Sequence, residues 1–232
     1  MGGPSNSSLR KAPTTPRHPD NTAPRPDYWV LLYVPNLIGY IRLSLLLLAF
    51  CLLHSSSPAW FVSFYTGSIV LDGFDGFAAR KLHQCSLFGA WFDVVLDNLS
   101  RGLLWTHIHP LLYLVSALEW TTFCCNYILG AEWQQTFTQG KKKGFSYFIS
   151  LLMAQNWRNP LGVLVILGLH VFPLWLFGIQ HGIFASHLTF VPSSVQVAGL
   201  VVLGCGRVLC GIVEVWCVAS HTRRLLVNSS PR

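Results

Sequence analysis

Charged side chains are scarce in this sequence. Of its 232 residues, 11% are Asp, Glu, Lys or Arg and only nine are acidic, whereas soluble domains carry roughly 25% charged residues. This is too little charge to cover a water-soluble domain, and 52% of the residues are hydrophobic. The composition excludes a disordered chain or a collagen, and it predicts a protein whose solvent is a lipid bilayer.

The chain also lacks a metal-binding or disulfide pattern of cysteines. Its seven cysteines fall mainly within apolar runs and show no ligand spacing, so we interpret them as buried thiols. The net charge of +7 forms no continuous patch, because the basic residues lie at the edges of apolar stretches, as in the cytosolic segments of membrane proteins. Nucleic acid is therefore not expected as a partner.

Residues 1–27 have almost no large apolar side chains and contain six of the thirteen prolines. We predict a disordered cytosolic tail here. It has no apolar stretch of the kind found in cleavable signal peptides, so the first hydrophobic segment is expected to direct membrane insertion. Residues 223–232 are predicted to form a second, short cytosolic tail, which leaves 28–222 as the transmembrane domain.

Six apolar windows have about the 20-residue length that crosses a bilayer. They cover residues 29–53, 58–80, 86–107, 110–134, 146–172 and 195–220. Polar residues and Pro160 interrupt the fifth. With both termini cytosolic, Lys81 and the lysines of 141–143 fall in cytosolic loops, and the opposite loops contain no Lys or Arg. The positive-inside rule then favours an all-α membrane protein with six transmembrane helices.

The last window is rich in glycine. Small residues let helix backbones approach closely in a membrane. Close packing, either within the chain or across a dimer, is therefore expected at Gly199, Gly204, Gly206 and Gly211.

Four of the acidic residues are concentrated in the second and third windows. Asp72 and Asp75 are three residues apart, and Asp93 and Asp97 are four apart, so each pair shares one face of its helix. The short connection makes the two helices antiparallel neighbours. Carboxylates at one depth in a low dielectric repel one another unless cations or protons neutralise them. Oxygen-only ligation favours Mg²⁺ or Mn²⁺.

Two interpretations of these carboxylates remain open from the residues alone. They can hold a metal beside a phosphate-bearing substrate, for which Arg80 offers a forked guanidinium and Gly76 and Gly89 leave space. Alternatively, they only pair with basic side chains and hold helices together, or they line an ion path. The arginines available for such pairs are Arg42, Arg101, Arg158 and Arg207.

Residues 72–97 read DGFDGFAARKLHQCSLFGAWFDVVLD. Eight positions in these 26 residues resemble the signature of the CDP-alcohol phosphatidyltransferase family. They are Asp72, Asp75, Gly76, Ala79, Arg80, Gly89, Asp93 and Asp97. Residues 33–42, YVPNLIGYIR, resemble the first helix of the phosphatidylinositol synthases of that family. The resemblance covers about residues 29–100, and residues 157–160 stand in place of a Ser-Arg-Pro element.

The resemblance implies a six-helix, usually dimeric enzyme that transfers a phosphatidyl group from CDP-diacylglycerol to an alcohol and releases CMP. Inositol is the favoured alcohol, and the endoplasmic reticulum, with a cytosol-facing site, is the implied location. The resemblance also implies that two Mg²⁺ or Mn²⁺ ions are held by Asp72, Asp75, Asp93 and Asp97. Asp97 would in addition be the general base. Contacts to CDP-diacylglycerol would come from Asn36, Gly76, Arg80 and Ser86.

Three alternatives to inositol transfer remain. The same signature serves other acceptors, such as glycerol 3-phosphate or serine. Intramembrane Asp and Arg also occur in transporters and channels. Finally, Asn98 stands where many relatives have Arg, as expected of a catalytically silent relative with a regulatory role.

Arg158 lies within the fifth apolar window, where an unpaired guanidinium is costly. One interpretation is a salt bridge to Glu119, Glu214 or one of the clustered Asp residues. The other is that Arg158 lines a polar cavity beside the metals and binds the acceptor or a phosphate oxygen. The likeness of 157–160 to the Ser-Arg-Pro element favours the second.

Overall fold

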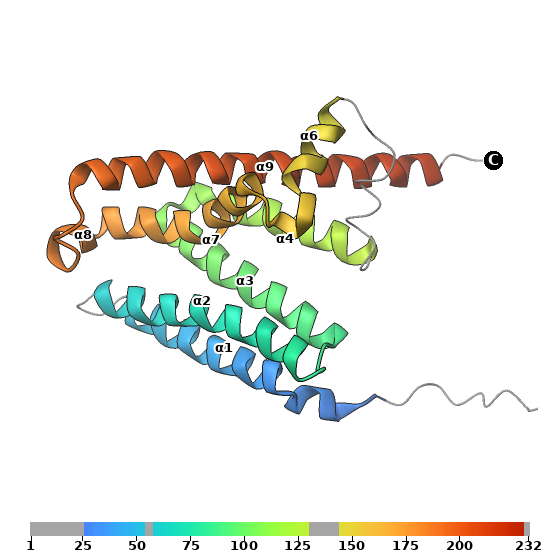
Figure 1. The fold of residues 1–232 in the computed structure, drawn as a ribbon, viewed down its shortest axis with the longest axis horizontal. Helices are drawn as coiled ribbons and strands as arrows, with labels where there is room; N and C mark the ends of the chain where they lie inside the picture. Colours follow the sequence, from blue (N-terminus) through green and yellow to red (C-terminus); the bar gives the residue numbers. More distant parts are fainter. Residues whose placement is uncertain (1–25, 54–57, 130–143, 230–232) are drawn as a thin grey trace, which may run out of the picture.

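The computed structural model describes residues 26–53, 58–129 and 144–229. Every regular element in these ranges is a helix and no strand occurs. Figure 1 shows two layers, a lower pair formed by α1 and α2 and an upper group formed by α4, α7 and α9. The helix α3 runs obliquely from the lower layer to the upper one, so it contributes to both.

The lower layer consists of α1 (Val34–Leu52) and α2 (Pro58–Lys81), which pack along their length. A short 3₁₀ helix, η1 (Tyr28–Leu32), precedes them. Aromatic side chains fill the contact between the layers, because Phe61 of α2 is fully buried and its ring centroid lies 4.5 Å from that of Phe177 in the upper layer. The two layers therefore share one hydrophobic core at this end.

The helix α3 (Leu87–Ile108) begins at a capping residue, Ser86, whose hydroxyl accepts a hydrogen bond from the Gly89 backbone N–H at 2.9 Å. Such a cap satisfies one of the free donors of the first turn. After a 3₁₀ turn, η2 (Pro110–Leu112), the chain reverses into α4 (Tyr113–Leu129) in the upper layer. The connection between α2 and α3 is short, but the two helices make few contacts with each other, because α3 turns away and packs against α1, α4 and α7. The prediction that α2 and α3 are antiparallel neighbours is therefore wrong.

The fifth predicted span is not one continuous helix. The chain forms α6 (Phe145–Leu152), the 3₁₀ helix η4 (Ala154–Trp157) and then α7 (Pro160–Gln180). Asn159 stabilises the break, because its amide donates to the carbonyl of Leu152 at 3.0 Å while its oxygen accepts from Gly162 N–H at 2.9 Å. Pro160 lacks an N–H and is tolerated only in the first turn of α7. The interruption predicted in the fifth window is therefore confirmed. The start predicted at 146 agrees with α6 to one residue, whereas the end predicted at 172 is too early, because α7 continues to Gln180.

The last helix, α9 (Ser193–Asn228), is 36 residues long and packs against α7. A one-turn helix, α8 (Ile183–Ser186), lies between them. A Cβ on Gly168 of α7 would overlap the backbone of Gly206 in α9, and a Cβ on Gly206 would overlap the Leu164 carbonyl. The close packing predicted at Gly206 is thus confirmed within the chain. The helix α9 continues to Asn228, so it includes most of the segment 223–232, whose location in the cytosol stays a prediction.

Three helices in the described ranges are long and apolar enough to cross a membrane: α1, α7 and α9. Both α2 and α3 have sufficient length, at 24 and 22 residues, but their Asp and Arg side chains lower their mean hydropathy. The described part of α4 has 17 residues. The chain is thus an all-helical membrane protein, and the count of six spans stays a prediction. The lysines of 141–143 and the tail 1–25 lie outside the described residues.

We expect Gly206→Ala to destabilise the protein, because the added methyl group forces α7 and α9 apart. Overpacking of a tight core typically costs ~1–3 kcal/mol. Gly204→Ala is the matched control on the same helix, since its Cβ would meet the Phe172 ring at an ordinary 3.5 Å. Thermal unfolding in detergent should give a lower Tm for Gly206→Ala alone. Equal Tm values for the two variants would contradict the close contact.

Candidate active site

The four predicted carboxylates converge on one guanidinium. Arg42 of α1 donates from Nη1 to Asp75 Oδ2 and Asp93 Oδ1, both at 2.6 Å. Its Nη2 lies 2.8 Å from Asp72 Oδ1 and 2.8 Å from Asp97 Oδ1. The helix periodicity that put each pair on one face thus brings all four to the same point between α1, α2 and α3.

The charges at this point do not balance. The Arg42 side chain is 3% exposed and offers one positive charge, whereas four carboxylates surround it. Several negative charges in a partly buried site repel one another unless further cations are present. The excess of negative charge at this point therefore favours the binding of divalent cations in addition to Arg42.

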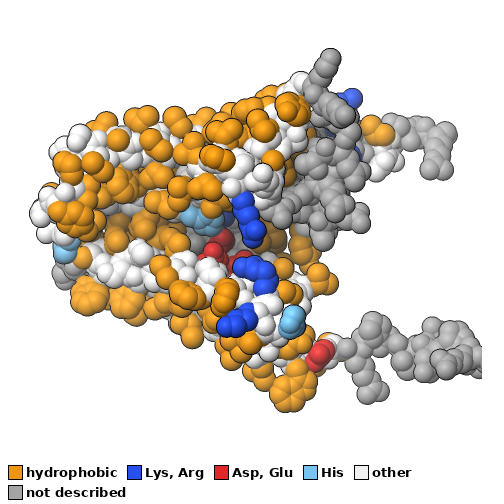
Figure 2. All heavy atoms as spheres, in the orientation of Figure 1, with side chains coloured by type: hydrophobic (Ala, Val, Ile, Leu, Met, Phe, Trp, Pro, Cys, Tyr) orange, Lys and Arg blue, Asp and Glu red, His pale blue; other side chains and the backbone are white. Residues whose placement is uncertain are grey.

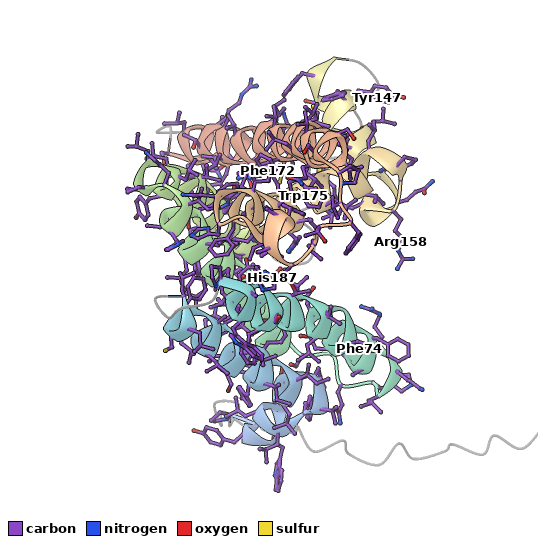
Figure 3. The ribbon with its side chains drawn as sticks, turned by 90° about the vertical axis from the view of Figure 1, so that its left-hand side faces the viewer. Phe74, Tyr147, Arg158, Phe172, Trp175 and His187 are labelled. Carbon is purple, nitrogen blue, oxygen red and sulfur yellow. The ribbon has the colours of Figure 1, made fainter. Side chains whose placement is uncertain are left out.

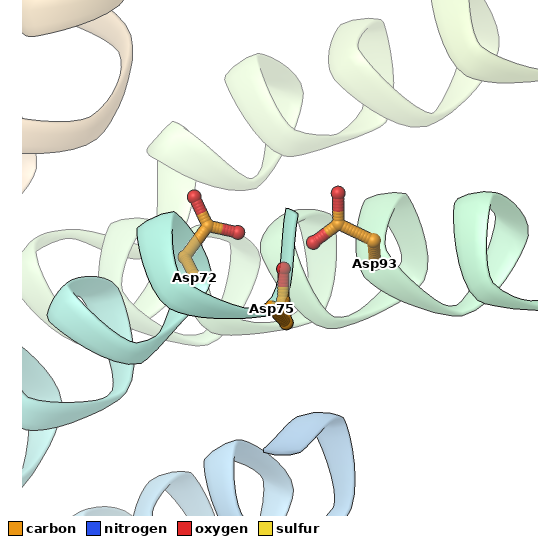
Figure 4. Close-up of side chains that lie close together, drawn as sticks. All are labelled: Asp72, Asp75 and Asp93. Carbon is orange, nitrogen blue, oxygen red and sulfur yellow. The ribbon is translucent and has the colours of Figure 1, made fainter. Parts of the chain in front are cut away.

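Three of the carboxylates are spaced to share a metal ion. Asp72, Asp75 and Asp93 each offer an oxygen, and these oxygens lie within 4.8 Å of one another (Figure 4). The Asp93 and Asp72 side chains are 44% and 34% exposed, so the group is open to solvent on their side. Hard oxygen donors with room for water ligands suit Mg²⁺ or Mn²⁺.

Asp97 lies at the edge of this group and is held differently. Its Oδ2 faces Arg101, one helical turn further along α3, at 3.3 Å. The Nε2 of His170, on α7, lies 3.8 Å from the same oxygen. Asp97 is thus oriented by Arg42 on one side and by Arg101 on the other. The role of Asp97 as a metal ligand stays a prediction.

A cavity of about 140 Å³ opens beside the carboxylates. It is lined by Asn36, Gly76 and Ser86 together with Asp75 and Asp93. Three of the four residues predicted to contact CDP-diacylglycerol therefore line one cavity, next to two of the predicted metal ligands.

Two hydrogen bonds shape the cavity wall. The Asn36 amide donates to the Val30 carbonyl at 2.6 Å, which orients this buried side chain. The side chain of Gln84 accepts from the Val34 N–H at 2.9 Å and ties the α2–α3 connection to the start of α1. A Cβ on Gly89 would lie 2.9 Å from Asn36 Oδ1. Gly89 thus makes room for the side chain of Asn36.

The fourth predicted contact, Arg80, is exposed at the end of α2. Its Nη1 lies 3.4 Å from where a Cβ on Gly76 would be, so Arg80 occupies the space that Gly76 leaves. Figure 2 shows acidic side chains within a hollow between the two layers, with Lys and Arg side chains at its edge. This charge distribution suits an anionic ligand that approaches a metal.

A second charged network lies behind Asp97, in the upper layer. Arg101 Nε donates to Glu119 Oε2 at 2.8 Å, and Arg207 Nη2 donates to Glu119 Oε1 at 3.2 Å. The Nη1 of Arg207 also bonds Glu214 at 3.1 Å. All four side chains are buried. The network links α3, α4 and α9 and connects them, through Arg101, to Asp97.

The structure corrects two expectations about Arg158. It is an exposed residue at the end of η4 and not a buried one, because the chain leaves the helix between 153 and 159. In Figure 3 its side chain projects from the bundle surface above Phe74 of α2. Glu119 and Glu214, the suggested partners of Arg158, are paired with Arg101 and Arg207. Its role in acceptor binding stays a prediction.

Sequence reasoning underestimated three residues of this site. Arg42 and Arg101 were considered only as structural partners, and His170 was given no role. The available signal was a charged or titratable side chain inside an apolar helix, which needs a partner or a function. Which carboxylate each one contacts could not be deduced from that signal.

Fold and site together define a helical membrane protein with a polyacidic centre suited to a divalent cation and a phosphate-bearing ligand. The family model described as CDP-alcohol phosphatidyltransferase matches residues 32–219. The chain belongs to this family, as the signature in residues 72–97 predicted.

Several relatives share the name CDP-diacylglycerol–inositol 3-phosphatidyltransferase. The chain is 42% identical over 88 residues to the CDP-diacylglycerol–inositol 3-phosphatidyltransferase of Homo sapiens. The matched region covers 38% of this chain and 40% of the relative. It is 40% identical over 82 residues to the Arabidopsis thaliana enzyme 1 of that name, covering 35% and 36%. The chain therefore matches well under half the length of these relatives. No solved structure matches it.

We expect Arg42→Gln to lower the Tm in metal-free buffer, because it leaves four carboxylates without their shared cation. Breaking a buried ion pair typically costs ~3–5 kcal/mol. Added Mn²⁺ should then raise the Tm more in Arg42→Gln than in the unmodified protein, since binding to the folded state stabilises it. Arg80→Gln, an exposed arginine outside the cluster, is the control. The same Mn²⁺ response in all three proteins would contradict a metal centre around Arg42.

Proposed function

We propose that this chain transfers the phosphatidyl group of CDP-diacylglycerol to myo-inositol, forming phosphatidylinositol and CMP. The observation that carries the proposal is the position of Asp97, beside the Asp72, Asp75 and Asp93 group and close to the cavity lined by Asn36 and Ser86. A candidate base, a candidate metal centre and a candidate nucleotide pocket thus adjoin one another. The names of the relatives support inositol as the acceptor.

In this proposal the cavity beside α1 holds the CDP part of the donor. Asn36 and Ser86 provide polar contacts at its wall, and Gly76 allows approach to the α2 backbone once the exposed Arg80 side chain swings away from it. Arg80, at the exposed end of α2, binds phosphate oxygens through its fork.

Mg²⁺ or Mn²⁺ would be held, in two sites, by Asp72, Asp75 and Asp93. Asp97 is the further ligand proposed from the family signature. When bound, such ions stabilise charge on a transferring phosphoryl group and on the leaving oxygen. The oxygens of the first three residues already lie close enough together for one ion. The open side of Asp72 and Asp93 leaves access for a diphosphate.

Asp97 would accept the proton of the attacking hydroxyl. Arg42 and Arg101 bracket its two oxygens, at 2.8 and 3.3 Å, and so fix the direction of the carboxylate. The positive charges also favour its ionised form, which a general base requires. His170 lies on the same side of Asp97 as Arg101, with its Nε2 3.8 Å from Oδ2.

The topology completes the proposal. Six spans with both tails in the cytosol would put the carboxylates near the cytosolic surface, where soluble inositol meets the membrane-bound donor. Location in the endoplasmic reticulum and assembly as a homodimer follow from the same family resemblance.

Asp97→Asn should abolish CMP release. Loss of a general base alone typically costs ~10²- to 10⁴-fold in rate. Purified protein is incubated with CDP-diacylglycerol and Mg²⁺ or Mn²⁺, and CMP is measured with inositol, glycerol 3-phosphate or serine. Asp27→Asn, which alters only the cap of η1, is the matched control.

Each result of this assay decides between the alternatives. Release with inositol alone supports the proposal, and release with another alcohol replaces the acceptor. An unmodified protein without metal-dependent release favours the silent relative or a transporter. Full activity of Asp97→Asn would remove Asp97 from the mechanism.

The topology predicts that residue 142 is reached from the cytosol and residue 187 from the other side. Lys142→Cys and His187→Cys, each placed in a variant whose native cysteines are replaced by serine, should react with an impermeant thiol reagent on opposite faces of sealed vesicles. Labelling of both from one face would refute the six-span arrangement.

A further inference from the structure

A large cavity lies apart from the cluster formed by Asp72, Asp75, Asp93 and Asp97. It measures about 680 Å³ and lies between α3, α4 and α9. Its walls are mainly apolar and include Trp91, Val94, Phe123 and Val213. The smaller cavity beside Asp93 is on the other side of α3, and the two share only Ala90 among their lining residues. The site beside Asp75 and Asp93 therefore does not open directly into the larger cavity.

Polar groups without partners line this cavity. The side chain of Asn98 is buried, with 3% of the residue exposed, and its Nδ2 has no hydrogen-bond partner among the described residues. Thr122 and Asn126 are half-buried residues, and the Oγ1 atom of the first and the Oδ1 atom of the second are also buried without a hydrogen-bond partner among the described residues. A buried polar group without a partner costs about 1–3 kcal/mol, so three along one cavity indicate that a ligand satisfies them. They offer both a donor and acceptors, which match hydroxyl groups.

The charged residues at this cavity favour a neutral ligand. Arg101, Glu119 and Glu214 line it, and Arg207 pairs with both glutamates. The two arginines and two glutamates sum to zero, and their charges already bond one another. An anionic or cationic head group would have to break these buried pairs, which a neutral hydroxylated one does not.

The volume and the walls favour a hydrocarbon chain. Cavities of this size accommodate drug-sized ligands, which are held mainly by apolar contacts with a few polar groups for orientation. A free polyol such as inositol would fill only a small part and leave the aromatic walls without contacts.

We propose that this cavity binds a neutral single-chain lipid of the monoacylglycerol class. Its chain lies along the α3 and α4 aromatics, and its hydroxyls bond Asn98, Thr122 and Asn126. The Oδ1 of Asn98 accepts from Arg101 at 2.6 Å, and Arg101 faces Asp97. The cavity proposed for the lipid is thus lined by Arg101, the arginine that orients the Asp97 carboxylate, and by Asn98, which bonds that arginine. The proposal does not rest on phosphatidyl transfer.

The test uses the full chain in nanodiscs and a monoacylglycerol that carries a photoreactive diazirine in its acyl chain. After irradiation, mass spectrometry maps the modified residues. We expect labelling on α3 and α4 at the cavity walls, competed by excess unlabelled monoacylglycerol. Labelling elsewhere, or labelling that the excess does not reduce, would overturn the proposal. Competition by CDP-diacylglycerol would reassign the cavity to the tails of the donor, and competition by inositol to the acceptor.

Variants separate the cavity from the rest of the bilayer-facing surface. Val94→Trp fills the cavity and should reduce labelling at least several-fold, whereas Leu99→Trp, exposed on the same helix, should not. Thr122→Val keeps the shape and removes one hydroxyl, so it should weaken competition by unlabelled monoacylglycerol roughly 2- to 10-fold, the equivalent of one hydrogen bond. Unchanged binding in both Val94→Trp and Thr122→Val would overturn the assignment.

The assay for CMP release is independent of this measurement. Specific labelling of a protein that releases no CMP would support the cavity and refute the proposed function. Release of CMP without specific labelling would support the proposed function and refute the lipid cavity.

Discussion

The contact on which the structure depends is the guanidinium of Arg42 among four carboxylates. It joins α1 to α2 and α3 around a buried guanidinium, and an isolated buried charge is costly. One positive charge holds the helices together without neutralising the group. The excess of negative charge makes the same contact a candidate metal centre. The ion pairs that hold the helices together and the site for a cation thus use the same four carboxylates.

The helix α3 carries this arrangement from one layer to the other. One of its faces presents Asp93 and Asp97 to Arg42, and Arg101, a turn beyond Asp97, enters the network of Glu119 and Arg207. The two cavities lie on opposite sides of this helix. A rigid helix whose charged side chains are bonded on both sides can hold a carboxylate in one orientation, which proton transfer to that carboxylate requires.

Glycine has two distinct uses in this fold. At Gly89 the missing side chain leaves room for Asn36 at the cavity wall, and at Gly168 and Gly206 it lets two helix backbones touch. The first use shapes a binding surface and the second holds the upper layer together. Close backbone approach is a common means of association between apolar helices, because burial of apolar side chains offers little advantage over contact with lipid.

The spacing of residues 72–97 alone predicted that the four carboxylates share helix faces and meet, because helical periodicity is a local property. The cap at Ser86 and the irregularity of the fifth window have similarly local causes. Only the tertiary structure decided that Arg42 is their common partner, that Arg101 rather than Arg158 pairs with Glu119, and that Asn98 lines a large cavity. These contacts join residues from different helices, and their pairing depends on helix packing, which no spacing along one helix specifies.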